Sequence, residues 1–281
     1  MRNPKMKLMM LIFITTAVLF GCSKTNDDAS VTEKTAAAMG GNAALLAVTT
    51  QQITASGQLF EPEQTFRPGD PSLSVSTFQY TLTQDLVGDR FRYDWGREVV
   101  YPFPATLTYS EVISGNQGFV DGQDTANAAA VRAGMLSVRV ATLMKLQRLT
   151  SPLTLMQTAL ETPQSVETRP DEQFGGKAHH VIALPGSVSP IRLFIDPDTF
   201  LPAKADTLED DPIYGDTRFE VLYSDWRRTG DIMVPFNLSQ RLTGMGKTTT
   251  LQTEGRTAAQ NNVQFQAGLL DIPQDLQAAY D

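Results

Sequence analysis

Short segments in which apolar and polar residues alternate recur along most of this chain, and they constrain its fold more than any other feature. From Thr77 to Leu82, every second residue is aromatic or aliphatic, and the residues between are threonine or glutamine. Because successive side chains of a β-strand point to opposite faces, this pattern is typical of an antiparallel sheet with one covered face. Comparable segments run over Arg90 to Tyr101, Ala105 to Ile113, Gln117 to Asp121, Ala178 to Leu184, Pro190 to Asp196, Leu201 to Glu209, Thr217 to Trp226, Ile232 to Thr243 and Thr248 to Gly255.

Turn-forming residues separate these segments at short, regular intervals. Pro102 and Pro104 separate the segment that ends at Tyr101 from the one that begins at Ala105. Gly115-Asn116 is typical of a tight hairpin turn. Further turn signals are Pro185-Gly186, Pro197-Asp198, Tyr214-Gly215, Thr229-Gly230 and Gly244-Met245-Gly246. This spacing predicts a meander, in which each strand pairs with the next one along the chain.

The middle of the chain departs from this pattern. From Thr125 to about Leu160 the residues favour helix and carry more apolar side chains than one covered face requires. Ser151-Pro152 matches an N-cap followed by proline in the first helical turn, so two helices forming a lid are expected at about residues 125–160. A short helix is also expected near Gly41 to Gln52. We therefore predict a mainly β fold with a helical insertion (α+β), an antiparallel curved sheet or half-barrel covered by helices.

The N-terminus carries an export signal. Basic residues at positions 2, 5 and 7 precede an apolar run from Leu8 to Phe20. As a helix this run would span about 20 Å, short of the roughly 30 Å hydrocarbon core of a membrane. A cleaved signal peptide over residues 1–21 is therefore expected, rather than a transmembrane anchor.

The signal ends at Leu19-Phe20-Gly21-Cys22, which resembles the lipobox of bacterial lipoproteins. The resemblance implies cleavage before Cys22 and acylation of that residue with diacylglycerol and a further acyl chain such as palmitate. The alternative is an ordinary cysteine, but the chain has no second cysteine to pair with it. We expect residues 22–40 to form a flexible tether and residues 41–281 a single domain. By resemblance to enterobacterial sorting signals, Ser23 implies the outer membrane, facing the periplasm.

The charge of the chain narrows the choice of partners. It has 23 Lys and Arg against 31 Asp and Glu, and loss of the predicted signal, with its three basic residues, brings the net charge from −8 to −11. Nucleic acid is a poor partner for such a chain. Without a disulfide inside the mature chain, stability must come from a packed core.

The C-terminal half carries a family resemblance. Residues 176–184, 191–204, 219–226 and 232–236 read GKAHHVIAL, IRLFIDPDTFLPAK, FEVLYSDW and IMVPF. This succession looks like the lipoprotein-localisation-factor (LolA/LolB-like) superfamily over most of residues 40–275. The resemblance implies an antiparallel half-barrel whose concave apolar face is closed by helices and holds acyl chains or other apolar ligands.

Residues 56–85 and 119–124 are also similar to the β-rich N-terminal domain found ahead of some metallo-β-lactamase-fold hydrolases. The hydrolase signature His-x-His-x-Asp-His cannot be built from a chain with two histidines. No hydrolase chemistry is therefore expected from this resemblance.

Several motifs in the sequence favour structural roles over functional ones. His179 and His180 are adjacent in a predicted strand and point to opposite faces, so a partly buried ring and an exposed ring are expected rather than a metal site. The segment Gly246 to Thr248 lacks the upstream glycine of a phosphate-binding loop, since position 241 is Arg241, and it is interpreted as a hairpin turn.

Asp206 with the acidic run Glu209 to Asp211 could bind a cation, but an exposed acidic loop is the favoured interpretation. No Gly-x-Ser-x-Gly elbow is found, and the single thiol is assigned to the anchor, so no nucleophile for covalent catalysis is evident. We expect neither catalysis nor a cofactor nor a metal.

The candidate ligand-binding residues are Met135, Leu143, Met144 and Met156. Flexible thioethers suit a surface that accommodates varied acyl chains, although ordinary packing of a helix on a sheet explains the same residues. The resulting hypothesis is a membrane-anchored lipoprotein that binds a lipid or acyl chains between sheet and helices. The alternatives are a non-catalytic envelope scaffold or protein-interaction module that presents loops such as residues 206–214 to an envelope protein, and, ranked last, an enzyme with a carboxylate site.

Overall fold

The computed structural model describes residues 29–61, 65, 67, 70–124, 131–211, 215–244 and 246–277. The predicted signal peptide, Cys22 and residues 125–130 lie outside this part of the chain. Thirteen described strands form one antiparallel sheet, in the order β6-β5-β4-β3-β2-β1-β13-β12-β11-β10-β9-β8-β7. The strands are β1 Thr50–Glu61, β2 Leu73–Asp85, β3 Arg90–Val99, β4 Ala105–Ser114, β5 Gln117–Gly122, β6 Val131–Gly134, β7 Glu167–Phe174, β8 Lys177–Leu184, β9 Ile191–Ile195, β10 Pro202–Asp211, β11 Gly215–Thr229, β12 Ile232–Gly244 and β13 Lys247–Asn261.

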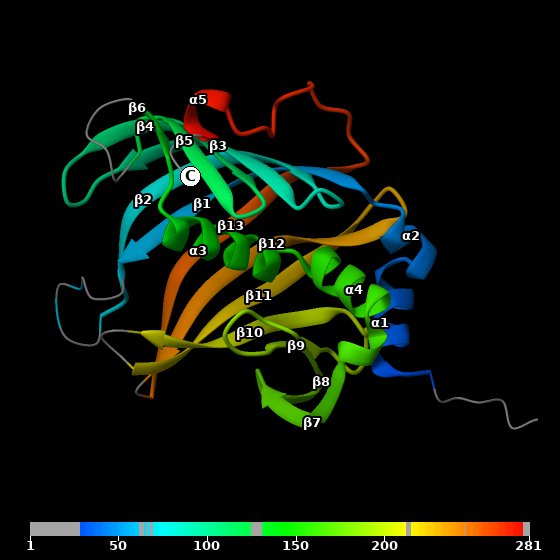
Figure 1. The fold of residues 1–281 in the computed structure, drawn as a ribbon. Coiled ribbons are helices and arrows are strands. Elements are labelled where there is room, and N and C mark those ends of the chain that lie inside the picture. The colour runs from blue at the N-terminus through cyan, green and yellow to red at the C-terminus, as the bar shows by residue number, and fades with distance from the viewer. Residues whose placement is uncertain are drawn as a thin grey trace, which may run out of the picture.

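The sheet is the predicted meander, with one long-range joint. Every pair of neighbouring strands is consecutive in the sequence except β1 and β13, whose pairing runs from Gln51 opposite Asn261 to Leu59 opposite Gln252. The sheet curves strongly and stays open, with helices on its concave side (Figure 1). The predicted fold class, a curved antiparallel sheet covered by helices, is confirmed.

The helices in the middle of the chain cross the concave side because of the strand order. The two edge strands, β6 and β7, are consecutive in the sequence, so the segment that joins them must pass from one edge of the sheet to the other. Helices α3 and α4 make this crossing (Figure 1). The described helices are α1 Val31–Met39, α2 Asn42–Leu46, α3 Ser137–Thr150, α4 Pro152–Glu161, the 3-10 helix η1 Pro163–Ser165, and α5 Gln274–Gln277. No helix among the described residues is long and apolar enough to span a membrane.

Three sequence predictions about these helices need correction. The predicted lid starts too early, because Val131–Gly134 forms strand β6 on the edge of β5 and helix begins only at Ser137. The open edge of β5 offers backbone hydrogen bonds, which outweigh the modest helix preference of these few residues. The second predicted helix does begin after Ser151, whose hydroxyl accepts a hydrogen bond from the backbone of Thr154.

The predicted tether is also too long, because residues 31–39 form α1. Ser30 and Glu33 make a capping box, in which each side chain accepts a hydrogen bond from the other residue's backbone N–H. Met39 is fully buried, so α1 belongs to the folded domain. The helix expected near Gly41 to Gln52 is limited to α2, since its last residues already belong to β1.

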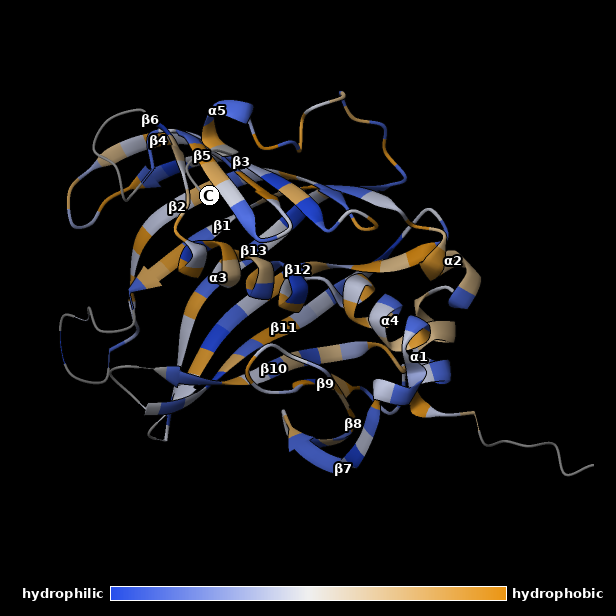
Figure 2. Ribbon diagram, viewed as in Figure 1, coloured by the Kyte–Doolittle hydropathy of each residue, from blue (hydrophilic) through white to orange (hydrophobic). Residues whose placement is uncertain are grey.

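Two apolar cores lie on the concave side. The first joins α1, α2 and α4 to strands β8–β12, and the second joins strands β1–β5 to the start of α3. Apolar and polar residues alternate along most strands, as the sequence predicts (Figure 2). The two helices of the lid differ, because five of the ten residues of α4 are buried, but only four of the fourteen of α3. Helix α3 therefore lies over a space that side chains do not completely fill.

Candidate binding cavity under helix α3

Four buried aromatic residues form the floor of this space. Tyr80 of β2, Tyr93 and Trp95 of β3, and Tyr109 of β4 occupy alternate positions on neighbouring strands and so share the concave face. The ring centroids of Tyr80 and Trp95 lie 4.9 Å apart, and those of Tyr93 and Trp95 lie 5.1 Å apart. We call these four residues the aromatic floor.

A cavity of about 350 Å³ lies between the aromatic floor and α3. This volume falls within the range of roughly 300 to 1,000 Å³ typical of small-molecule sites. Its walls combine the aromatic rings with two half-buried leucines of α3 and several polar side chains. The lining residues are Tyr80, Tyr93, Trp95, Arg97, Tyr109, Glu111, Arg139, Leu143, Leu146, Thr150, Gln240, Gln252 and Glu254.

The first turn of α3 is held to β4 by a buried ion pair. Arg139 Nη2 lies 2.6 Å from Glu111 Oε1, and its Nη1 lies 2.7 Å from Asp124 Oδ2. Although burial acts to lower the pKa of Arg139, the hydrogen bonds to these carboxylates outweigh it and raise that pKa. Glu111 also accepts a hydrogen bond from Trp95 Nε1 at 2.8 Å. One carboxylate therefore positions both the helix and an aromatic ring of the cavity.

The last turn of α3 is held by strands on the other side of the β1–β13 joint. Tyr223 donates its hydroxyl to the carbonyl oxygen of Leu149, and Arg256 Nη2 donates to the carbonyl oxygen of Thr150 at 3.0 Å. Burial raises the pKa of Tyr223, so its hydroxyl stays protonated as a donor. These bonds satisfy helix carbonyls that lack partners within α3. The helix is thus fixed at both ends across the sheet.

A second buried carboxylate, Glu254 of β13, holds another ring. The hydroxyl of Tyr80 donates to Glu254 Oε1 at 2.9 Å. Burial and the negative charge of Glu254 both raise the pKa of Tyr80 well above its usual value. Arg256 Nε lies 3.5 Å from the same oxygen, close enough for charge attraction but without the geometry of a hydrogen bond. Glu254 is therefore balanced by a tyrosine donor and a buried cation.

The four residues proposed from the sequence as ligand contacts fall in different places. Leu143 lines the cavity. Met156 is fully buried in the first core, and Met135 is buried in the second, against which Met144 packs half-buried. Their contact with a ligand stays a prediction. The aromatic floor is not among the predicted contacts, although the alternation of Phe91, Tyr93 and Trp95 in the sequence indicates it.

His179 and His180 point to opposite faces of β8, as the alternation predicts, and Gly246 lies in the predicted hairpin turn. His179 is buried and its Nδ1 lies 2.9 Å from the carbonyl oxygen of Lys177, while His180 is half-exposed and pairs with Asp171 at 3.0 Å. Within the described ranges, no group of three or more potential ligands could hold a metal ion. The segment around Gly246 is the hairpin turn between β12 and β13, where Gly244 pairs with Lys247.

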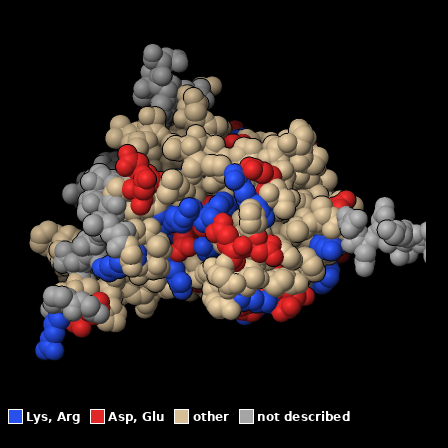
Figure 3. All heavy atoms as spheres, turned by 90° about the horizontal axis from the view of Figure 1, so that it is seen from below, with Lys and Arg blue, Asp and Glu red and all other residues tan. Residues whose placement is uncertain are grey.

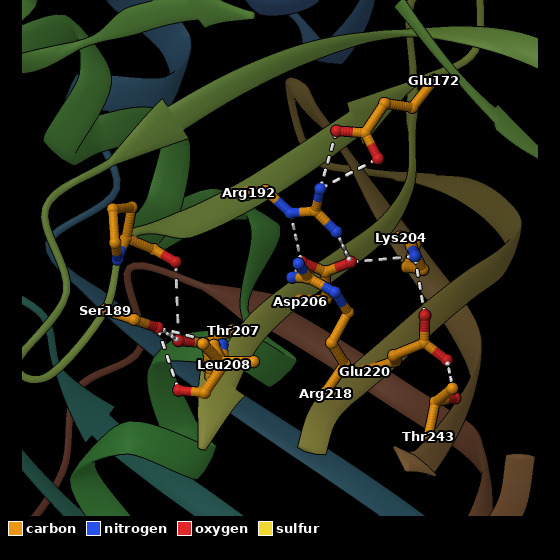
Figure 4. A network of polar contacts seen from close by, with 11 residues as sticks. Glu172, Ser189, Arg192, Lys204, Asp206, Thr207, Leu208, Arg218, Glu220 and Thr243 are labelled. Carbon is orange, nitrogen blue, oxygen red and sulfur yellow. Dashed lines mark hydrogen bonds and ion pairs between the residues drawn. The ribbon is translucent and has the colours of Figure 1, made fainter. Parts of the chain in front are cut away.

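The prediction of an exposed acidic loop at Asp206 to Asp211 is wrong. These residues belong to β10, and Asp206 is completely buried. Its carboxylate accepts hydrogen bonds from Arg192 Nε and Nη2, both at 2.7 Å, and lies 2.9 Å from Lys204 Nζ (Figure 4). Basic and acidic side chains gather side by side on the face seen from below in Figure 3. The carboxylate is tolerated inside the strand because several cations neutralise it.

Glu209, in the same strand, turns toward the lid instead. Its Oε1 lies 2.6 Å from Lys145 Nζ of α3. The surface that the scaffold alternative required is thus largely absorbed into β10, and residues 212–214 lie outside the described part of the chain.

No protein-family model and no curated protein matches this sequence. Among solved structures, the chain is similar to the crystal structure of the LolA superfamily protein NE2245 from Nitrosomonas europaea, with a TM-score of 0.42 and 11% identity over 87% of this chain and 94% of that one. It is also similar to an uncharacterized conserved protein from Thermus thermophilus, with a TM-score of 0.30 and 9% identity over 88% of this chain and 94% of that one.

Proposed function

We propose that this protein binds a lipid, or another ligand with an apolar chain, in the cavity between α3 and the aromatic floor. The observation that carries the proposal is the cavity itself, about 350 Å³ in volume and walled by four aromatic rings and two leucines. An apolar chain in this cavity would pack against the rings, which are already largely out of water, and would bury the two half-buried leucines further.

The packing of α3 supports this role. Leu143 and Leu146 line the cavity and are only half-buried, although they lie in the middle of a helix fixed at both ends. A ligand chain would supply the contacts that these side chains lack in the described structure. Ordinary core packing, as in α4, leaves no such space.

The test is to purify the protein from bacterial membranes, extract it with organic solvent and analyse the ligand by mass spectrometry, alongside titration with a fluorescent fatty-acid probe. Leu143→Gln should weaken probe binding by roughly tenfold. Leu136→Gln is the matched control, because Leu136 precedes the same helix and is 77% exposed. Absence of both extracted lipid and probe binding, or equal effects of the two variants, would refute the proposal.

We also infer that residues 1–21 are removed and that Cys22 carries a lipid anchor that holds the protein at the outer membrane, facing the periplasm. The support is the lipobox-like ending of the signal and the polar residues that follow it. Two or three acyl chains on one residue suffice for stable attachment. Cys22→Ser should abolish labelling with palmitate and move the protein from the membrane fraction to the soluble fraction. Retention of the variant in membranes would contradict the anchor.

The second candidate function is an interaction module for an envelope protein. It is favoured by one observation, the exposed apolar side chains of the loop between β3 and β4, where Phe103 is 80% and Val100 is 62% exposed. Isolated apolar groups of this kind are common, whereas neighbouring ones mark contact sites. Phe103→Ser should then release a co-purifying partner while ligand binding in the cavity is unchanged. Co-purification that is insensitive to this substitution counts against the module.

A further inference from the structure

Arg97 is a cation of the cavity wall that has no anionic partner in the part of the chain that the structure describes. It lies two residues after Trp95 on β3 and therefore on the same face. Its guanidinium carbon lies 4.4 Å from the ring centroid of Trp95 and 5.6 Å from that of Tyr109. Among the described residues it has no hydrogen-bond or ion-pair partner, and its buried Nε has no acceptor.

The carboxylates of the same cavity are already engaged. Glu111 accepts from Trp95 and forms an ion pair with Arg139, and Glu254 accepts from Tyr80 and lies near Arg256. Arg97 differs from Arg139 in this respect, since Arg139 binds two carboxylates. Stacking on an aromatic ring stabilises a guanidinium, but it leaves the in-plane N–H donors unused. The wall therefore offers positive charge and donors that no described carboxylate satisfies.

Arg97 lies at one end of the cavity, together with two amides. Through the register from β3 across β2 and β1 to β13, Arg97 aligns with Glu254, and Val99, the last residue of β3, aligns with Gln252. Gln252 in turn pairs with Gln240. Both amides line the cavity, and that of Gln252 already donates to Glu254 Oε2 at 3.3 Å, whereas Tyr93 lies four residues before Arg97 on β3, toward the other end. Arg97 and the two amides thus lie at one level along the strands, whereas the ion pair of Glu111 and Arg139 lies at the level of Tyr93.

We propose that the ligand of this cavity is an anionic amphiphile, whose carboxylate or phosphate head is bound by Arg97 while its apolar chain lies against the aromatic floor and α3. The guanidinium matches such heads because it presents two parallel N–H donors to two oxygens. This inference rests on the proposed function and narrows its ligand class. It assigns Arg97 as the residue that selects the head group.

The experiment compares three sixteen-carbon probes with different heads, palmitate, hexadecanol and hexadecyltrimethylammonium, by competition with a fluorescent probe on the purified full-length protein. Palmitate should bind at least about tenfold more tightly than the alcohol. Arg97→Gln should weaken the binding of palmitate by about ten- to a hundredfold and leave the binding of hexadecanol unchanged. Arg97→Lys should have an intermediate effect on palmitate binding. The matched control is Arg92→Gln, which removes the same charge from the opposite face of β3, where Arg92 pairs with Asp94.

The outcomes separate the two proposals. Equal affinity for palmitate and hexadecanol, or equal weakening of all probes by Arg97→Gln, refutes the role of Arg97 while binding of an apolar chain stands. Binding of none of the three probes refutes the proposed function and this inference with it. Because the comparison of head groups uses the unaltered protein, it decides the question even if Arg97→Gln fails to fold. Lysophosphatidate then distinguishes a phosphate head from a carboxylate head. Tighter binding of lysophosphatidate than of palmitate assigns a phosphate head to the ligand, and weaker binding assigns a carboxylate head.

Discussion

Replacing Asp206 with alanine tests whether the buried charges of β10 stabilise the sheet. In the native protein its carboxylate contacts three cations, with Arg192 Nε and Nη2 at 2.7 Å, Lys204 Nζ at 2.9 Å and Arg218 Nη1 at 3.5 Å. The side chain of Lys204 is only 7% exposed, and that of Arg192 is 17% exposed. Neither cation can turn freely into water when the carboxylate is removed.

The expected loss can be estimated from the contacts that survive. Removing one partner of a buried ion pair destabilises a protein by about 3 to 5 kcal/mol. Lys204 keeps Glu220 at 2.7 Å, and Arg192 keeps Glu172 at 2.7 Å, so the lower end applies. We expect Asp206→Ala to lower the free energy of unfolding by about 3 kcal/mol, a large share of the roughly 5 to 15 kcal/mol of a typical domain.

The measurement is urea-induced unfolding at neutral pH, followed by tryptophan fluorescence. Arg218→Ala is the control, because the side chain of Arg218 is 41% exposed and lies 3.5 Å from Asp206, farther than the other two cations. This substitution should lower the free energy of unfolding by less than about 1 kcal/mol. Asp206→Asn keeps the shape of the side chain and should fall between the two. A loss below about 1 kcal/mol for Asp206→Ala, or one equal to that of Arg218→Ala, would refute the reasoning.

Three further predictions follow from other parts of the structure. Arg139→Met should lower the free energy of unfolding by about 2 to 3 kcal/mol, since it removes the cation that contacts the buried carboxylate of Glu111, and should also weaken probe binding; an unchanged urea midpoint would contradict this. Met156→Ala should lower the free energy of unfolding by about 2 to 5 kcal/mol. Leu136→Ala, at a site that is 77% exposed, should lower it by less than about 0.5 kcal/mol in the same assay. Burial acts to raise the pKa of Asp196, but hydrogen bonds from Lys177 and two backbone N–H groups outweigh it and lower that pKa to about 2. The resulting stabilisation is present above about pH 4 and is lost as the pH falls through 2. Asp196→Asn should therefore lower the free energy of unfolding by about 1 to 2 kcal/mol at pH 7 and by much less at pH 2, and a loss independent of pH would exclude the mechanism.

The strands could be predicted from sequence because their signal is local. Each face of a strand is recorded by every second residue, and turn residues mark the ends, so segments such as Ala178 to Leu184 were predicted with the bounds of β8 nearly unchanged. The sequence predicts the helix and strand bounds poorly where the local signal is short or where tertiary contacts outweigh it. The capping box of Ser30 and Glu33 is four residues long, and the strand β6 depends on the edge of β5 rather than on its own residues.

Asp206 illustrates a different limit. In the sequence it is followed by three acidic residues at positions 209–211, a composition typical of exposed loops. Lys204 lies in β10 itself, but the other two cations, Arg192 of β9 and Arg218 of β11, reach Asp206 only when these strands pair with β10. Burial of a charge depends on partners that are distant in sequence, so composition alone predicts it poorly.

The cavity depends on a contrast between two helices that look alike in sequence. Both α3 and α4 carry leucine and methionine, yet α4 fills a core and α3 covers a space. The reason lies in the strands beneath them. Under α3, the polar tips of Tyr80 and Trp95 are hydrogen-bonded to the buried carboxylates of Glu254 and Glu111, so these rings cannot turn to fill the space. A floor of rings held by their polar tips, under a helix fixed at both ends, keeps the cavity open, and both conditions arise only from pairings across the whole sheet.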